Sequence, residues 1–270
     1  MRYPAKIFCD FVSFDLNCSQ QIELYVNEIP TTAKSDDVLR FVYLIVPNDI
    51  QDERNRAIFF YKKTYDFLLT HDDFLLQRIP DAYLLEFGSC WAKNYVLTQK
   101  DFAVSFVCGG KMITQGHMLR RAIWENENAI TSIKKNFYIS SNFSGNLSNP
   151  KSYPMLRSDK NALFNSQFHI CIENSRQTNF FTEKLIDAIY TKTIPIYYGC
   201  NNISDWFDTR GLILVNSLEE TIDVIRNLKE ATYNQMLPYV EENYTRSLRF
   251  VDFNAHVKKK IVEIVEKLKI

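Results

Sequence analysis

Two apolar runs of strand length, separated by a short amphipathic helix, place the tightest constraint on how this chain can fold. Residues 168–172 and 194–198 are rich in apolar and β-branched side chains, as buried strands are. Between them, Leu185 and Ile189 mark one face of a helix. A strand, a helix and a strand at this spacing predict two parallel strands joined by a right-handed crossover.

The polar segment between the first strand and the helix is where we expect a ligand to bind. In open parallel sheets, ligands bind outside the carboxyl ends of the strands. The unpaired N–H groups of a helix start, with Thr182 as N-cap, suit a phosphate or diphosphate, and Lys184 adds affinity once the anion arrives. Glu183 could accept hydrogen bonds from vicinal hydroxyls of a ribose or hexose. Short polar residues able to hold this loop or contact the ligand are Asn174 and Ser175.

The pattern made by ENS, six intervening residues, TEK, an apolar helix and IPIYYG resembles the donor-binding signature of the family-10 glycosyltransferases, the α-1,3-fucosyltransferases. A capped helix start with a solvated ion pair would explain residues 182–184 taken alone. It would not explain so many fixed offsets together. The matching residues are Glu173, Asn174, Ser175, Thr182, Glu183, Lys184, Pro195 and Gly199. The chain departs from the usual signature at Asn179 and Phe180, where the family has Asp and Tyr.

The resemblance implies a fold for the chain and roles for its residues. The fold would be α/β and of GT-B type, with two facing Rossmann-like domains and a C-terminal helix crossing back to the first. We expect an N-terminal acceptor-side domain over residues 1–97, a donor-binding domain over 98–252 and the C-terminal helix over 253–270. Lys184 would bind the diphosphate of the donor, and Glu183 the hydroxyls of the ribose or of the transferred sugar.

The reaction implied by the resemblance is transfer of fucose from GDP-fucose to a hydroxyl of a glycan, with inversion and without a bound metal or other cofactor. A single displacement needs a general base for the acceptor proton and cations for the leaving diphosphate. Relatives use a glutamate that follows a strand like residues 38–46, and Asp49 is the nearest carboxylate here. The fallback candidates are Asp52 and Glu53. An Asp49 that only caps a turn or helix is an equally good interpretation.

A second segment with phosphate-binding character begins at the strand predicted over residues 102–108. Two glycines, Lys111 and a basic helix over residues 116–124 follow it. Neither the GxGxxG nor the GxxxxGK[ST] spacing is present. The resemblance places an arginine for the donor diphosphate near the start of this helix, and we favour Arg120 over the other candidates, Arg121 and His117. A solvated basic helix face is the alternative.

Histidines and cysteines give little reason to expect a metal site. His71 is followed by two aspartates, and we interpret Asp72 as a helix cap. No His or Cys cluster has the spacing of metal ligands. The six cysteines contain no CxxC pair, and we interpret them as reduced thiols.

Composition is that of an ordinary globular protein and argues against some partners. With 46% apolar residues and a net charge of +0, the 270-residue chain has no electrostatic basis for nucleic acid or anionic membrane as its main partner. Neither a secretory leader nor an apolar run of about 18 residues is evident, so we expect a cytoplasmic protein of bacterial or viral source. The expected partners are a nucleotide-sugar donor and a glycan acceptor; the oligomeric state, acceptor and linkage stay open.

Two other functions remain open at this stage. The loop chemistry indicates a diphosphate and a polyol rather than guanine or fucose, so another nucleotide sugar could be the donor. A non-catalytic nucleotide-sugar or glycan-binding protein could also have kept the fold, since the glutamate expected after residues 38–46 is missing.

Further elements complete the prediction. Strands are expected over residues 38–46, 65–69, 83–87, 137–140 and 211–215, and helices over 53–62, 73–78, 218–228 and 254–268. Residues 93–100 are expected to link the domains, and residues 136–160 to form a long loop around one short strand.

Overall fold

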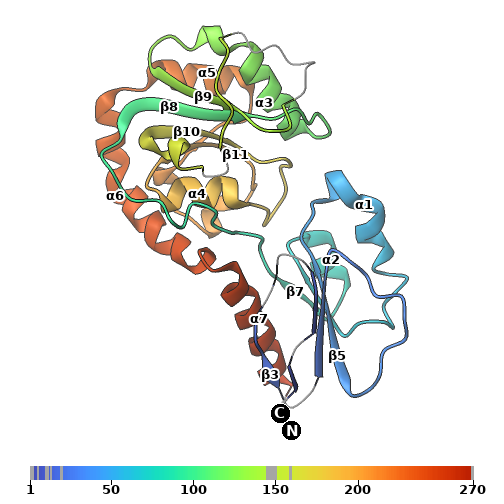
Figure 1. Ribbon diagram of the computed structural model, residues 1–270. Helices are drawn as coiled ribbons and strands as arrows, with labels where there is room; N and C mark the ends of the chain where they lie inside the picture. Colours follow the sequence, from blue (N-terminus) through green and yellow to red (C-terminus); the bar gives the residue numbers. More distant parts are fainter. Residues whose placement is uncertain are drawn as a thin grey trace. The chain divides into compact units, whose positions relative to one another are not determined.

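Two five-stranded parallel sheets, each in its own compact unit, organise the chain in the computed structural model (Figure 1). The structure describes residues 3–4, 6–9, 12, 14–18, 21–143, 151–157 and 160–268. Unit 1 comprises Met1–Phe87, Gln177–Phe180 and Asp252–Ile270, and unit 2 comprises Gly88–Arg176 and Phe181–Val251. The chain therefore passes from unit 1 to unit 2 and returns to unit 1 at its C-terminal end.

The sheet of unit 1 has the strand order β2-β4-β5-β6-β7, with all neighbours parallel. Its strands are β2 (Lys6–Phe8), β4 (Gln21–Val26), β5 (Val38–Leu44), β6 (Phe67–Thr70) and β7 (Ala82–Leu84). Two short strands, β1 (Tyr3–Pro4) and β3 (Asn17–Cys18), form a separate antiparallel pair. The helices of this unit are α1 (Asn48–Ala57), α2 (Asp73–Arg78) and α7 (Phe253–Lys267).

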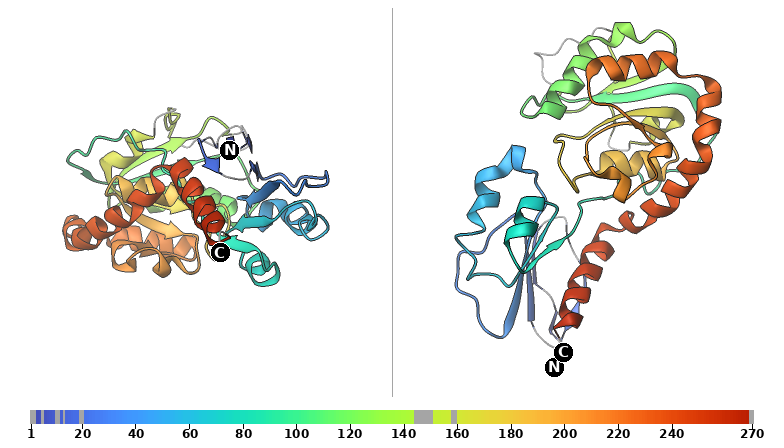
Figure 2. Two further views of the ribbon diagram at one scale, coloured as in Figure 1. Left: turned by 90° about the horizontal axis from the view of Figure 1, so that it is seen from below. Right: turned by 180° about the vertical axis from the view of Figure 1, so that it is seen from behind.

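Helix α7 buries one stripe against the sheet of unit 1, and Figure 2 shows it beside these strands from behind. The stripe consists of Val257, Ile261, Ile264 and Val265, at the spacing of one helix face. These side chains share a core with Leu24 of β4 and Phe41 of β5. The expected return of the C-terminal helix to the first domain is confirmed.

The sheet of unit 2 has the order β12-β11-β10-β8-β9, again parallel throughout. Its strands are β8 (Asp101–Cys108), β9 (Lys134–Ile139), β10 (Ser166–Ile172), β11 (Ile194–Tyr198) and β12 (Ile213–Leu214), and its helices are α3 (Gln115–Glu125), α4 (Glu183–Tyr190), α5 (Leu218–Asn227) and α6 (Glu230–Ser247). Short 3-10 helices lie at Glu127–Ala129, Asn161–Asn165, Ile203–Asp205, Thr209–Gly211 and Leu248–Phe250.

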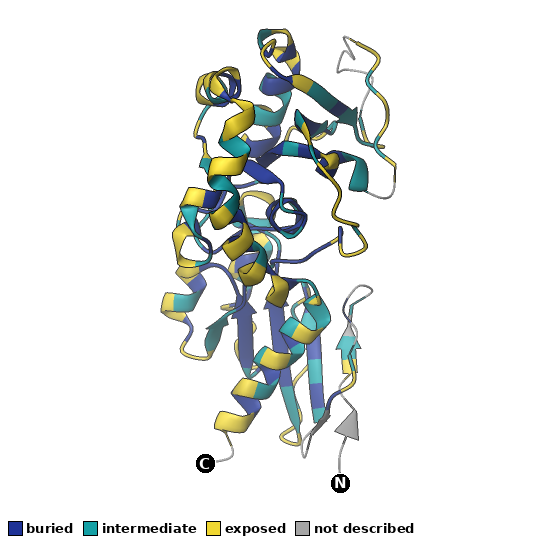
Figure 3. Cartoon of the chain, turned by 90° about the vertical axis from the view of Figure 1, so that its left-hand side faces the viewer, coloured by how far each residue is buried: buried dark blue, intermediate teal, exposed yellow. Residues whose placement is uncertain are grey.

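Helices cover both faces of this second sheet. Apolar residues of α3 and α5 pack with one set of strand side chains, and α4 packs with the alternate set. Burial on both faces explains why the inner strands β10 and β11 are apolar along most of their length; buried residues are dark blue in Figure 3. The predicted unit of strand, helix and strand is confirmed, because β10 pairs in parallel with β11 from Phe168–Ile194 to Ile172–Tyr198.

Several predicted elements differ from the structure in their bounds. The strand expected over residues 38–46 ends at Leu44, and the helix expected over 53–62 already begins at Asn48. The strand expected over 211–215 is reduced to two residues, since a 3-10 turn occupies its start. Helix α6 was not predicted, because Pro238 lies inside it and its apolar stripe is weak.

The cysteines whose side chains the structure describes are not joined by disulfide bonds. Cys9, Cys90, Cys108, Cys171 and Cys200 are free cysteines, whereas the side chain of Cys18 lies outside the described residues. None of the helices formed by the described residues is both long and apolar enough to cross a membrane. Within the loop expected over residues 136–160, residues 144–150 and 158–159 lie outside the described part.

Candidate functional site

A cavity of about 420 Å³ opens in unit 2 where the carboxyl ends of β8 and β10 meet the starts of α3 and α4. This edge of a parallel sheet is where ligands bind in such folds. Four cationic side chains line the cavity, namely Lys111, Arg120, Lys160 and Lys184. Asn174, Glu183, His117 and Trp91 also line it. The cavity can therefore attract an anionic ligand.

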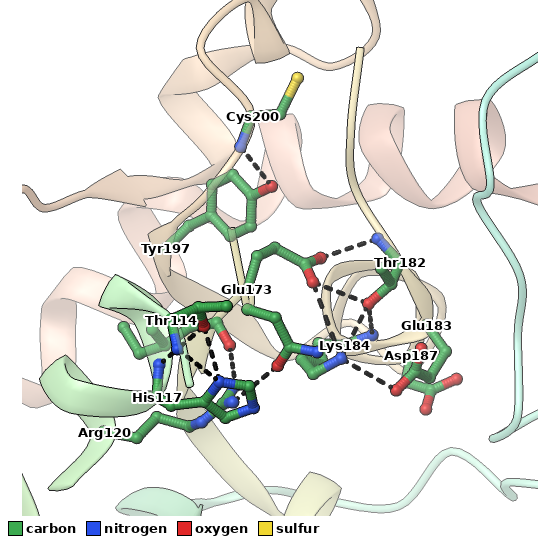
Figure 4. Close-up of polar contacts among 12 residues, drawn as sticks. Thr114, His117, Arg120, Glu173, Thr182, Glu183, Lys184, Asp187, Tyr197 and Cys200 are labelled. Atoms are coloured by element: carbon green, nitrogen blue, oxygen red, sulfur yellow. Dashed lines mark hydrogen bonds and ion pairs between the residues drawn. The ribbon is translucent and has the colours of Figure 1, made fainter. Parts of the chain in front are cut away.

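The start of α4 is tied to the end of β10 through a buried carboxylate (Figure 4). Glu173 Oε1 accepts the backbone N–H of Thr182 at 2.7 Å, and Oε2 accepts the Thr182 hydroxyl at 2.8 Å. The Thr182 hydroxyl oxygen in turn accepts from the backbone N–H of Lys184 at 3.3 Å and from its Nζ at 3.1 Å. The capped helix start is therefore fixed before any ligand arrives.

Lys184 is held as a cation between two carboxylates. Its Nζ lies 3.2 Å from Glu183 and 3.7 Å from Glu173. Burial opposes the charged form, but Glu183 and then Glu173 outweigh it and raise the pKa of Lys184. Burial also works against ionised Glu183, yet Lys184 and Lys160 lower its pKa to about 2. Both cavity-lining groups are therefore charged at neutral pH.

Glu173, by contrast, is fully buried and does not line the cavity. Burial raises the pKa of its carboxyl group. Its contacts are to Thr182 and Lys184, so in this structure it supports the helix start from behind the cavity wall. Ser175 is likewise fully buried, and its hydroxyl has no hydrogen-bond partner among the described residues.

Arg120 reaches from α3 to the end of β10. Its Nη1 donates to the Ile172 carbonyl oxygen at 2.6 Å, and its Nη2 donates to Asn174 Oδ1 at 2.6 Å. Burial lowers the pKa of this guanidinium, which stays charged at neutral pH because its intrinsic pKa is so high. Arg121 instead pairs with Glu125 at 2.7 Å within the helix. The structure thus brings Arg120, and not Arg121, to the cavity.

Close backbone packing fixes the start of α3 against the loop after β10. The Gly116 N–H donates to the Asn174 carbonyl oxygen at 3.1 Å, and a Cβ on Gly116 would lie 1.8 Å from the Glu173 carbonyl oxygen. Thr114 caps the helix, and its hydroxyl lies 2.6 Å from His117 Nδ1. Burial, then Arg120 and the nearby lysines, lower the pKa of His117 to about 4, so its ring is neutral.

The candidate general bases lie in unit 1. Asp49 is exposed in the first turn of α1, and its Oδ1 accepts from Gln177 Nε2 at 3.3 Å. Asp52 pairs with Arg56 at 2.8 Å, and Glu53 is exposed. Asp49 is therefore a helix-start residue whose carboxylate remains open to water.

Asp72 is the N-cap of α2, as predicted, and accepts the Phe74 N–H at 2.8 Å. His71 is buried with its ring 4.9 Å from that of Phe180, and burial lowers its pKa to about 4. The described residues contain no group of three or more His, Cys, Asp or Glu side chains that could hold a metal ion.

The sequence did not point to Trp91 and Lys160, which line the cavity, or to Asp187, which pairs with Lys160 but does not line it. Asp187 gave the only available signal, a carboxylate one turn after Glu183 in an otherwise apolar helix. Trp91 and Lys160 come from irregular segments, where no periodicity points to a site.

The chain matches the sequence model of a known protein family. The sequence model of glycosyltransferase family 10 (fucosyltransferase), C-terminal part, matches residues 122–268. The chain therefore belongs to glycosyltransferase family 10. The matched region contains α4 and the loop before it, whereas Arg120 and Gly116 lie just outside it.

Two relatives match shorter segments. Alpha-(1,3)-fucosyltransferase FucT of Helicobacter pylori is 30% identical over 93 residues, which are 33% of this chain and 19% of that protein. GDP-fucose protein O-fucosyltransferase 3 of Danio rerio is 28% identical over 97 residues, which are 35% of this chain and 21% of that protein. The matches thus span about a fifth of these curated relatives.

Solved structures confirm the GT-B type of fold. A crystal structure of alpha1,3-fucosyltransferase with GDP has a TM-score of 0.52 at 17% identity, covering 88% of this chain and 77% of that one. Trehalose 6-phosphate synthase from Burkholderia multivorans has a TM-score of 0.60 at 11% identity, covering 93% and 72%. The glycosyltransferase TarM has a TM-score of 0.56 at 11% identity, covering 89% and 54%.

Proposed function

We propose that this protein is a fucosyltransferase that moves fucose from GDP-fucose to a hydroxyl of a glycan acceptor. The observation that carries the proposal is the cavity of unit 2, where Arg120, Lys184 and the start of α4 converge on one space. Family membership narrows the chemistry to glycosyl transfer, and the GDP-bound fucosyltransferase of the same fold is consistent with this donor.

The donor diphosphate would lie against Arg120 and Lys184. Both are charged and held by existing contacts, so they need little reorganisation when charge develops on the leaving group. The dipole of α4 adds a partial positive charge at its start, where the N–H groups of Thr182 and Lys184 already bond to Glu173 and to the Thr182 hydroxyl. Ionised Glu183 would accept hydrogen bonds from the hydroxyls of the ribose or the sugar.

The reaction would be a single displacement with inversion. The acceptor oxygen forms a bond to the anomeric carbon as the bond from that carbon to the phosphate oxygen breaks, and GDP leaves with the electron pair. The acceptor proton passes to a carboxylate, for which we propose Asp49 because its side chain is exposed. We propose no metal, since Arg120 and Lys184 can supply the positive charge, and no other cofactor.

Calorimetric titration with GDP and with UDP tests the donor assignment. We expect GDP to bind more tightly, and Lys184→Ala to weaken it by roughly 1 to 3 kcal/mol, as loss of a charge-assisted contact does. Lys192→Ala is the matched control, because Lys192 pairs with Glu241 at 2.7 Å and lies outside the cavity lining. Tighter UDP binding would favour a transferase for another nucleotide sugar. If neither nucleotide binds, the proposed function is wrong.

Turnover separates an enzyme from a protein that only binds nucleotide sugars or glycans. Release of GDP from GDP-fucose, with fucose appearing on an acceptor, is expected of the wild type and should be lost in Asp49→Asn while GDP affinity is kept.

The five free cysteines of the described chain suit a reducing compartment, and we propose that the protein acts in the cytoplasm.

A further inference from the structure

One side of the cavity has no role in the diphosphate site that we propose at Arg120 and Lys184. It consists of Trp91, Lys160 and Glu183. Figure 4 shows Glu183 and Asp187 on the opposite side of Lys184 from His117 and Arg120. Arg120 of α3 therefore lies on one side of Lys184, and Glu183 and Asp187 of α4 lie on the other.

Asp187 connects this side of the cavity to α4. Its Oδ1 accepts the backbone N–H groups of Trp91 at 2.6 Å and of Ala92 at 3.0 Å, and its Oδ2 lies 3.3 Å from Lys160 Nζ. The carboxylate is 1% exposed. A buried carboxylate persists only where such partners compensate its lost hydration. Asp187 therefore fixes both the backbone at Trp91 and the ammonium group of Lys160.

Lys160 joins the sugar-binding candidate Glu183 to the aromatic side chain. Its Nζ lies 3.6 Å from Glu183 Oε1 and 4.2 Å from the centroid of the Trp91 ring. An ammonium group placed this close to an aromatic ring is attracted by the ring face. The three side chains thus form one polar and aromatic surface on the cavity.

Trp91 is the unusual member, because this large aromatic residue is 63% exposed although its backbone is fixed. Indole rings at binding sites offer a rigid apolar surface beside polar groups. A pyranose has the complementary chemistry, with hydroxyl groups around its edge and an apolar face of C–H groups. GDP lacks this pyranose, so a comparison of GDP with GDP-fucose isolates any contact to it.

We propose that Trp91 and Lys160 contact the transferred sugar of the nucleotide-sugar donor and determine specificity for it, and that Asp187 is the positioning residue for both. The indole packs against the apolar face of the pyranose, while Lys160 donates to its hydroxyls and Glu183 accepts from them. This inference rests on the proposed function, because it assigns the part of the donor that extends beyond the diphosphate.

Affinities for GDP and GDP-fucose, measured in parallel by calorimetry, test the inference. Trp91→Ala should lower the affinity for GDP-fucose about three- to tenfold and change the affinity for GDP by less than about twofold. Loss of an aromatic contact to the sugar predicts this difference. Trp91→Phe should keep most of the affinity. Lys160→Met should likewise lower the affinity for GDP-fucose and leave the affinity for GDP unchanged. Lys192→Met is its control, since Lys192 likewise pairs with an acid and lies 4.9 Å from the Tyr244 ring centroid.

Asp187→Asn tests the positioning role by spectroscopy as well as affinity. GDP-fucose should change tryptophan emission in the wild type and not in Trp91→Phe, because Trp91 is the exposed tryptophan at the cavity. In Asp187→Asn both this signal and the affinity for GDP-fucose should fall while GDP still binds. Equal loss of GDP and GDP-fucose in Trp91→Ala, or no loss of either, overturns the inference. Failure of the wild type to bind GDP overturns the proposed function itself.

Discussion

Glu173 and Thr182 are joined by two hydrogen bonds, from the Thr182 N–H to Oε1 at 2.7 Å and from its hydroxyl to Oε2 at 2.8 Å. The pair closes the loop between β10 and α4, because Glu173 follows the last residue of the strand and Thr182 caps the helix. Both residues belong to the family signature, yet neither lines the cavity. Part of the signature therefore holds the loop between β10 and α4 in shape, and another part lines the cavity.

Glu173→Gln should destabilise the protein and weaken its binding of GDP. The amide offers one acceptor where the carboxylate offers two, so a buried donor of Thr182 loses its partner, at a cost of roughly 1 to 3 kcal/mol. Lys184 also loses a neighbouring negative charge. Urea unfolding and GDP titration measure the two effects. Exposed Glu266→Gln is the control, and equal behaviour of the two variants would show that Glu173 has no supporting role.

Gly116→Ala should be strongly destabilising, since its Cβ would lie 1.8 Å from the backbone oxygen of Glu173. Backbone cannot move away as a side chain can, and we expect a loss of about 1 to 3 kcal/mol of unfolding free energy. Gly109→Ala is the matched control. A Cβ there meets only the side chains of Asn142 at 3.0 Å and Ser140 at 3.1 Å, which can rotate. If both variants lose the same unfolding free energy, close packing against the Glu173 carbonyl oxygen is not what requires glycine at position 116.

Arg120→Lys should lower GDP affinity about tenfold or more, whereas Arg121→Lys should leave it unchanged. Lysine cannot reproduce the two contacts that the Arg120 guanidinium makes to Ile172 and Asn174 while also facing the cavity. Arg121 interacts with Glu125 on the same helix, and a surface pair of this kind contributes little. Titration of both variants with GDP gives the comparison. If Arg121→Lys weakened GDP binding and Arg120→Lys did not, the diphosphate contact would instead lie on the face of α3 that carries Arg121.

Local patterns explain how much of this site could be predicted. The strands at residues 168–172 and 194–198, the cap at Thr182 and the choice of Arg120 all follow from short-range spacing or from the family signature. The contacts of Asp187 with Trp91 and Lys160 could not, because they join segments 96 and 27 residues apart in the chain. Only the folded sheet brings such segments together. Helix α6 was missed for a different reason, since its Pro238 is a local signal against a helix that tertiary packing overrides.

Protein stability should fall as the pH drops from about 6.5 toward 4, because three histidines are buried in neutral form. Burial is the main cause that lowers the pKa of His71 and His117 to about 4 and of His169 to about 3, against 6.5 for the ordinary side chain. Within this window the unfolded chain binds more protons than the folded one, so acid favours unfolding. The raised pKa values of Glu173 and Asp187 act in the opposite direction and partly offset the loss.

A single variant isolates the contribution of His169, whose Nδ1 lies 2.8 Å from the Ser105 hydroxyl. Glutamine at this position keeps a polar partner for Ser105 but cannot titrate. Between pH 7 and 4.5 the unfolding free energy of the wild type should therefore fall by on the order of 2 to 3 kcal/mol more than that of His169→Gln. Urea unfolding at the two pH values measures this difference, whatever the variant costs at pH 7. Parallel curves for the two proteins would mean that His169 titrates normally in the folded state.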